Sequence, residues 1–172
     1  CALPISFGWS VSLNGDSAII SAAQDDDLGD DAGSVYVFNR DGTTWNQDAK
    51  LLAEDGMAGD AFGSSVDFDG AHLVVGAIAG DEGIGDSGSA YVFSVDDQGT
   101  PATSDDVWTL EAEVTAASPD TVDEFGFSVS LDGDHFVVGD PSHTELGADA
   151  GGAEVFIDRK STRLNSSHSS VS

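Results

Sequence analysis

Three acidic, glycine-rich stretches carry the side chains of this 172-residue chain that are best suited to binding chemistry. They cover residues 24–32, 79–87 and 142–150, and each has an acidic residue at the same two positions. Closely spaced carboxylates, with backbone carbonyls that neighbouring glycines allow to turn inward, are ligands that Ca²⁺ prefers. We therefore predict weak Ca²⁺ ligands at the recurring positions Asp27, Asp31, Glu82, Asp86, Glu145 and Asp149.

These stretches also have a purely structural interpretation. Asp and Gly are common in surface turns, where an Asp side chain accepts hydrogen bonds from nearby backbone amides. Asp31, Asp86 and Asp149 each come shortly before an apolar segment, so they would cap the start of a strand. The composition of the stretches favours this role over a cation site.

The acidic stretches recur because a longer unit recurs. Each unit opens with Phe-Gly and ends with an aromatic or apolar run that closes on Phe, 31 positions later. The opening residues are Phe7, Phe62 and Phe125, and the closing residues are Phe38, Phe93 and Phe156. Such fixed internal spacing is typical of repeat proteins.

Each unit has the pattern of four short β-strands. A turn dipeptide follows the opening Gly after six residues and predicts a tight hairpin: Asn14-Gly15, Asp69-Gly70 and Asp132-Gly133. The strand before this turn alternates apolar and polar residues, whereas the strand after it is a continuous apolar run. A third strand follows each acidic stretch, and a fourth is expected near residues 45–52 and 108–114. Four strands per unit without helical periodicity predict the four-stranded antiparallel blades of a β-propeller.

The residues that carry this pattern resemble a known repeat. Phe-Gly, an apolar strand, Val-Gly-Ala and Tyr-Val-Phe are similar to the FG-GAP repeat of integrin α-subunit propellers and of many secreted bacterial proteins. The resemblance covers roughly residues 7–157 and implies an all-β fold. The family often places a Ca²⁺ loop in the first hairpin of a blade, but the hairpins of this chain are too short to encircle an ion.

The three repeats form one expected domain, residues 1–157. Because propellers close with about four to eight blades, we expect a partial propeller whose remaining blades belong to a longer protein. The composition changes at residues 158–172, where Asp158 to His168 resembles a translated sequencing adapter. We interpret this segment as a non-native, disordered tail.

The charge of the chain restricts its partners. Thirty-two acidic against five basic residues give a net charge of −27, which disfavours nucleic acids and anionic membrane surfaces. The chain has no apolar run long enough for membrane insertion, and its one cysteine, Cys1, cannot form an internal disulfide.

Catalytic patterns are weak. His72, His135 and His143 are interpreted as surface turn histidines, because no second His stands at metal-ligand spacing from them. Trp9 and Phe127 stand at equivalent positions, where packing in the core or at the rim is favoured over stacking on a sugar. Asp60 and Asp123, each two residues before Phe-Gly, are expected to set the turn between repeats.

These patterns predict a non-catalytic adhesion or interaction module of a secreted or cell-surface protein, bacterial by its resemblance. Its blades would present loops, chiefly residues 94–107, to a protein or glycan ligand. Two alternatives are the propeller of a larger secreted enzyme and a cation-stabilised structural repeat without a specific ligand.

Overall fold

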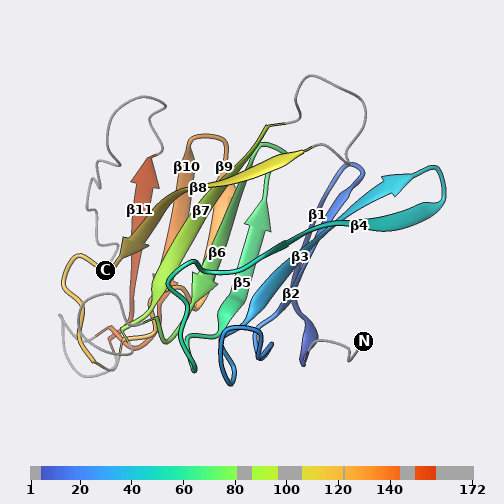
Figure 1. The fold of residues 1–172 in the computed structure, drawn as a ribbon. Coiled ribbons are helices and arrows are strands. Elements are labelled where there is room, and N and C mark those ends of the chain that lie inside the picture. Colours follow the sequence, from blue (N-terminus) through green and yellow to red (C-terminus); the bar gives the residue numbers. More distant parts are fainter. Residues whose placement is uncertain (1–4, 81–86, 97–105, 122, 144–149, 158–172) are drawn as a thin grey trace.

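The structure is a computed structural model that describes residues 5–80, 87–96, 106–121, 123–143 and 150–157. Glu82, Asp86, Glu145, Asp149 and the tail at residues 158–172 lie outside the described residues. The described chain is all β, with three antiparallel sheets that follow one another in sequence (Figure 1). This arrangement confirms the predicted partial β-propeller, and we call the sheets the first, second and third blade.

The blades share one strand order. The first blade consists of β1 (Phe7–Asn14), β2 (Ser17–Ala22), β3 (Ser34–Asp41) and β4 (Thr44–Leu51). The second blade consists of β5 (Phe62–Phe68), β6 (His72–Ala77), β7 (Ser89–Asp96) and β8 (Val107–Thr115). The third blade consists of β9 (Ser128–Asp132), β10 (His135–Asp140) and β11 (Gly152–Ile157). Within these ranges, no helix is long and apolar enough to cross a bilayer.

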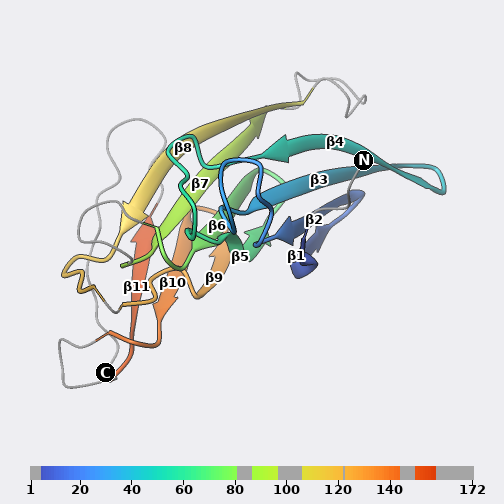
Figure 2. The same ribbon diagram turned by 60° about the horizontal axis from the view of Figure 1, so that its bottom comes forward.

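The first strands of the three blades lie side by side, and the second blade lies between the other two (Figures 1 and 2). Their polar side chains connect one blade to the next. The Ser12 hydroxyl accepts a hydrogen bond from the Phe68 amide at 3.2 Å and donates one to Asp67 Oδ1 at 3.1 Å. Asp67 Oδ2 in turn accepts from the Leu131 amide of the third blade at 2.8 Å. The polar side chains of the first strands therefore link neighbouring blades by hydrogen bonds.

The apolar core lies between the blades. The first and second blades share one cluster, in which Phe62 is completely buried against Tyr91 and Phe93. The second and third blades share another, which includes Phe125, Phe136 and Phe156. All of β6 is buried, as its continuous apolar run predicts for a strand that is covered on both faces.

The outer faces of the first and third blades have no neighbour within the described residues. Phe7, the equivalent of Phe62, contacts Tyr36 and Phe38 with nearly the same ring geometry, yet it is 44% exposed. Val137 of β10 is 37% exposed, whereas its equivalent Val74 is fully buried. Both end faces thus have the residues of a blade-to-blade interface.

A backbone contact fixes the distance between blades. Phe62 forms a parallel bridge with Gly33, and its amide donates to the Ala32 carbonyl at 2.9 Å. A Cβ on Gly33 would lie 2.1 Å from the Phe62 carbonyl oxygen, and a Cβ on Gly88 would lie 2.1 Å from that of Phe125. Glycine at this position, which precedes the third strand in every repeat, is therefore required by the next blade.

We predict that Phe62→Ala lowers the free energy of unfolding by about 3–5 kcal/mol, because it leaves a cavity between two blades. The matched variant Phe7→Ala removes the same ring from an open face and should cost about 1 kcal/mol. Urea titrations followed by far-UV circular dichroism measure both values. Equal losses would contradict the assignment of the β1 face as uncovered.

We predict that Gly33→Ala destabilises the protein by more than the strain of a left-handed backbone, because the added Cβ collides with the Phe62 backbone. Gly15→Ala is the control, since Gly15 also has a positive φ, of 57°, and a Cβ there meets nothing within 4 Å. The control should cost roughly 1–2 kcal/mol. A melting temperature for Gly33→Ala that equals that of the control would refute the close contact.

Candidate functional site

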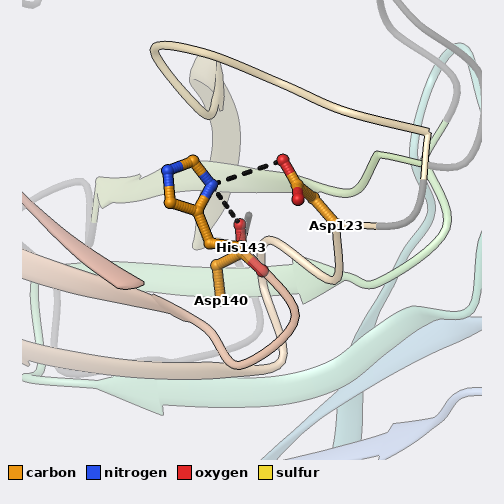
Figure 3. A group of neighbouring side chains, drawn as sticks. All are labelled: Asp123, Asp140 and His143. Carbon is orange, nitrogen blue, oxygen red and sulfur yellow. Dashed lines mark hydrogen bonds and ion pairs between the residues drawn. The ribbon is translucent and has the colours of Figure 1, made fainter. Parts of the chain in front are cut away.

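Two carboxylates and one imidazole meet at the end of β10. Asp123 lies in the turn before β9, Asp140 is the last residue of β10, and His143 follows three residues later. His143 Nδ1 lies 3.4 Å from Asp123 Oδ2 and 3.3 Å from Asp140 Oδ2 (Figure 3). One ligand atom from each residue lies within 4.8 Å of the other two, and among the described residues this is the one such group of three.

Both carboxylates of this Asp-Asp-His cluster are buried: Asp123 is 1% exposed and Asp140 is 3% exposed. Asp140 Oδ1 accepts hydrogen bonds from the amides of Glu124, at 3.1 Å, and Ser142, at 3.2 Å. Asp123 Oδ2 accepts from the Asp120 amide at 2.8 Å. Within the described part of the chain, the other oxygens, Asp123 Oδ1 and Asp140 Oδ2, accept no hydrogen bond.

The cluster is electrostatically unbalanced. Burial raises the pKa of Asp140 above its ordinary value, and the Asp123 carboxylate adds to this effect, while His143 and two backbone amides oppose it. An imidazolium contributes at most one positive charge against two carboxylates. The arrangement is thus suited either to an ion pair with protonated His143 or to a cation between the three side chains.

The first blade uses the equivalent of the His143 position differently. Asp25 occupies it, and Asp25 Oδ2 accepts hydrogen bonds from Ser34 and Tyr36, both at 2.8 Å, and from the Lys50 ammonium at 2.9 Å. The buried carboxylate therefore has its own cation. In the second blade this position is Gly80.

These contacts change the pKa values of both charged partners. Burial alone would raise the pKa of Asp25, but the hydrogen bonds from Lys50, Tyr36 and Ser34 outweigh it and lower the pKa. Burial would likewise lower the pKa of Lys50, but bonds to Asp27, Tyr36 and Asp25 hold it above its ordinary value. The pair is charged throughout the neutral range.

Of the six predicted Ca²⁺ ligands, the structure describes Asp27 and Asp31. Asp27 Oδ2 lies 2.5 Å from the Lys50 ammonium, so a metal ion there would compete with this amine. Asp31 has a positive φ of 57°, and its carbonyl accepts a hydrogen bond from the Ala61 amide at 3.1 Å. The Asp31 amide is itself capped by Asp26 Oδ1 at 2.9 Å. Ca²⁺ binding by these stretches stays a prediction.

The predicted turn role of two other acidic residues is confirmed. Asp60 and Asp123 are both buried, and each carboxylate accepts a hydrogen bond from the backbone amide three residues earlier. The donor to Asp60 is the Met57 amide at 2.6 Å, and the donor to Asp123 is the Asp120 amide at 2.8 Å. Asp123 therefore has two roles, because it shapes the turn between blades and also faces His143.

The interpretation of the histidines as surface turn residues is correct for the exposure of His135, which is the first residue of β10, but is wrong for the other two. His72 is buried, with Nδ1 3.9 Å from Asp69 Oδ2, and His143 belongs to the Asp-Asp-His cluster. Spacing between histidines could not reveal this cluster because two of its ligands are aspartates. The usable signal was the departure of the third repeat from the others, with Asp140 in place of Ala22 and Ala77.

Trp9 and Phe127 do not pack into a core. Trp9, near the start of β1, is 58% exposed, and its equivalent Phe127, just before β9, is 54% exposed. The glycine before each has a positive φ, which turns the chain sharply at this point. Core packing is therefore not found among the described residues, whereas rim packing and stacking on a sugar stay predictions for these two exposed rings.

The family model described as FG-GAP repeat matches residues 6–38, 45–93 and 108–156. No curated protein matches the chain.

We predict that Lys50→Met lowers the free energy of unfolding by about 1–3 kcal/mol, since it removes the cation from a buried carboxylate. Because the folded state lowers the pKa of Asp25, its stabilisation is complete above the ordinary value of 3.8 and is lost as the pH falls through the folded value. Lys50→Met lets this pKa rise, so acid unfolding should begin at a higher pH.

Arg40→Met is the control for Lys50→Met, because Arg40 pairs with Asp16 on the surface of the same blade. Exposed pairs contribute about 0–1 kcal/mol, so this variant should unfold nearly as the parent does. Tryptophan fluorescence in urea and acid titrations measures both variants. A Lys50→Met variant with unchanged acid unfolding would show that Lys50 does not stabilise Asp25.

Proposed function

Because the chain belongs to the FG-GAP repeat family, we propose that this propeller-type interaction module is a non-catalytic adhesion element of a secreted or cell-surface protein. FG-GAP repeats occur in extracellular and surface proteins, which supports this location. Its ligand would be a protein or a glycan that binds to the edges of the blades. The blades act as a rigid scaffold, and the connections between strands provide the contacts.

The observation that carries this proposal is the unequal length of two equivalent connections. In the first blade, Asp41 pairs with Thr44, so only Gly42 and Thr43 join β3 to β4. In the second blade, Asp96 pairs with Val107, so residues 97–106 join β7 to β8. The paired strands keep the same register up to these points, and residues 97–105 lie outside the described part. A long connection on an unchanged blade is typical of a loop that makes contacts.

The exposed aromatic rings support a second contact region. Trp9 and Phe127 present large apolar surfaces to solvent, and such rings stack on the faces of sugars or pack against protein side chains. They stand at the start of β1 and just before β9, whereas β7 ends at the opposite edge of its blade (Figure 1). The ligand would thus have two rims from which to approach.

We predict that replacing residues 97–106 with Gly-Thr, the turn of the first blade, abolishes adhesion and leaves stability unchanged. The graft keeps the pairing of Asp96 with Val107 and the packing of Trp108 against the core. Beads coated with the parent chain or the graft are tested for retention on immobilised glycans and extracellular-matrix proteins, and thermal melts check folding.

A double variant, Trp9→Ala with Phe127→Ala, separates the two rims in the same assay. Loss of retention in the graft alone assigns adhesion to the long connection. If the graft adheres as the parent does, residues 97–106 do not carry the function. Failure of the parent beads to adhere to any surface would overturn the proposed function.

A further inference from the structure

We propose that Asp123, Asp140 and His143 bind a divalent transition metal ion of the Zn²⁺ type, which fastens the turn before β9 to the end of β10. His143 lies in the third acidic stretch, but the site shares no ligand with the six positions predicted to bind Ca²⁺ and includes no residue of the first hairpins of the blades. It adds a structural ion to the third blade.

The spacing of the three side chains fits a tetrahedral ion. Zn²⁺ binds His nitrogen and carboxylate oxygen at about 2.0–2.2 Å, so two ligand atoms of a tetrahedral site lie roughly 3.3–3.6 Å apart. His143 Nδ1 lies 3.4 Å from Asp123 Oδ2 and 3.3 Å from Asp140 Oδ2. Two edges of the tetrahedron are thus already present. Figure 3 shows both carboxylates turned toward the same side of the imidazole ring.

The buried oxygens are a second, independent observation. Asp123 and Asp140 are both more than nine-tenths buried, and among the described residues Asp123 Oδ1 and Asp140 Oδ2 accept no hydrogen bond. A buried carboxylate oxygen that accepts no hydrogen bond has lost its hydration without replacement, and the one contact of Asp140 Oδ2 given above is with the His143 ring. The remaining oxygen of Asp140 is held by two backbone amides, which orient the carboxylate as a second shell orients a metal ligand.

The charge of the cluster favours a cation from outside the blade. The sequence has no Lys or Arg between Lys50 and Arg159, so neither the second nor the third blade has an ammonium or guanidinium group to offer. In the first blade, Lys50 neutralises Asp25, which stands at the position equivalent to His143. A divalent ion beside a neutral imidazole would balance Asp123 and Asp140 in the same way.

The nitrogen ligand decides the type of ion. Ca²⁺ and Mg²⁺ take oxygen ligands, whereas imidazole with carboxylates suits Zn²⁺ and neighbouring transition metals. His143 is 15% exposed at its side chain, so an ion can enter from solvent, and a water molecule would complete the coordination.

A paired change in the repeat makes room for the imidazole. A Cβ on Gly152 would lie 3.1 Å from His143 Cδ2 and 3.3 Å from Cγ. The equivalent position is Ser34 in the first blade, where it donates to Asp25, and Ser89 in the second, opposite Gly80. The third repeat therefore combines His143, the proposed ligand, with Gly152, whose missing side chain leaves room for the imidazole ring.

The test is titration of the full chain with Co²⁺, which gives tetrahedral sites visible absorption, followed by displacement with Zn²⁺. One equivalent should bind, and Zn²⁺ should raise the melting temperature until a chelator is added. His143→Gln should weaken binding at least about 100-fold, and Gly152→Ala, which shifts the ring without removing a ligand, about 10-fold. His135→Gln is the control, because His135 is exposed in β10 outside the cluster.

Three results would overturn the proposal. These are no saturable Co²⁺ binding, equal binding by the His143→Gln variant, and displacement of Co²⁺ by millimolar Ca²⁺ as expected for acidic surface groups. Far-UV circular dichroism of each variant without metal shows whether it has folded. The zinc site does not rest on adhesion, since the Gly-Thr graft keeps all three ligands and His143→Gln keeps residues 97–106. Metal binding and adhesion can therefore be tested separately, and the loss of one leaves the other measurable.

Discussion

The contact between the Phe-Gly backbone of one blade and a glycine of the preceding blade is the constraint on which the rest of this structure depends. The Phe62 backbone lies against Gly33, and that of Phe125 lies against Gly88, in space that a single Cβ would fill. The same holds at Gly76, where the carbonyl of Gly126 would be 2.0 Å from a Cβ. Because the backbones of neighbouring blades are in contact at these points, the distance between the blades is fixed. This distance determines how the apolar side chains between the blades pack.

This fixed frame allows one backbone position to carry different chemistry in each blade. The position 18 residues after the opening Phe is Asp25, Gly80 and His143 in the three repeats. In the first blade it holds a carboxylate bound to Lys50, in the second it holds no side chain, and in the third it holds an imidazole between two carboxylates. The repeat thus conserves geometry through its glycines and aromatic rings, whereas charge varies freely at the blade ends.

The outer faces of the first and third blades are apolar, like the faces that pack between neighbouring blades. On β1, Phe7, Val11 and Leu13 are exposed, although their equivalents Phe62, Val66 and Phe68 are buried in the second blade. Covering such an apolar sheet face with a further blade would remove these side chains from water and so stabilise the protein. The same residues thus form core or surface according to what stands beside them.

The sequence by itself determined the repeat, the strands and the turns, because these follow from local rules. Alternating and continuous apolar runs, Asn-Gly and Asp-Gly turns, and aromatic residues at fixed spacing need only near neighbours to be interpreted. The turn role of Asp60 and Asp123 was local in the same sense, since each binds an amide three residues away.

Only the tertiary structure decided which polar residues meet. Asp123 and Asp140 lie 17 positions apart in the sequence, and Asp25 and Lys50 lie 25 apart, so no spacing rule pairs them. The sequence also did not determine exposure, because Trp9 and Phe127 are large aromatic residues, a type common in cores, and yet both are exposed. Burial and charge pairing depend on how the blades stack, and stacking brings together residues that are remote along the chain.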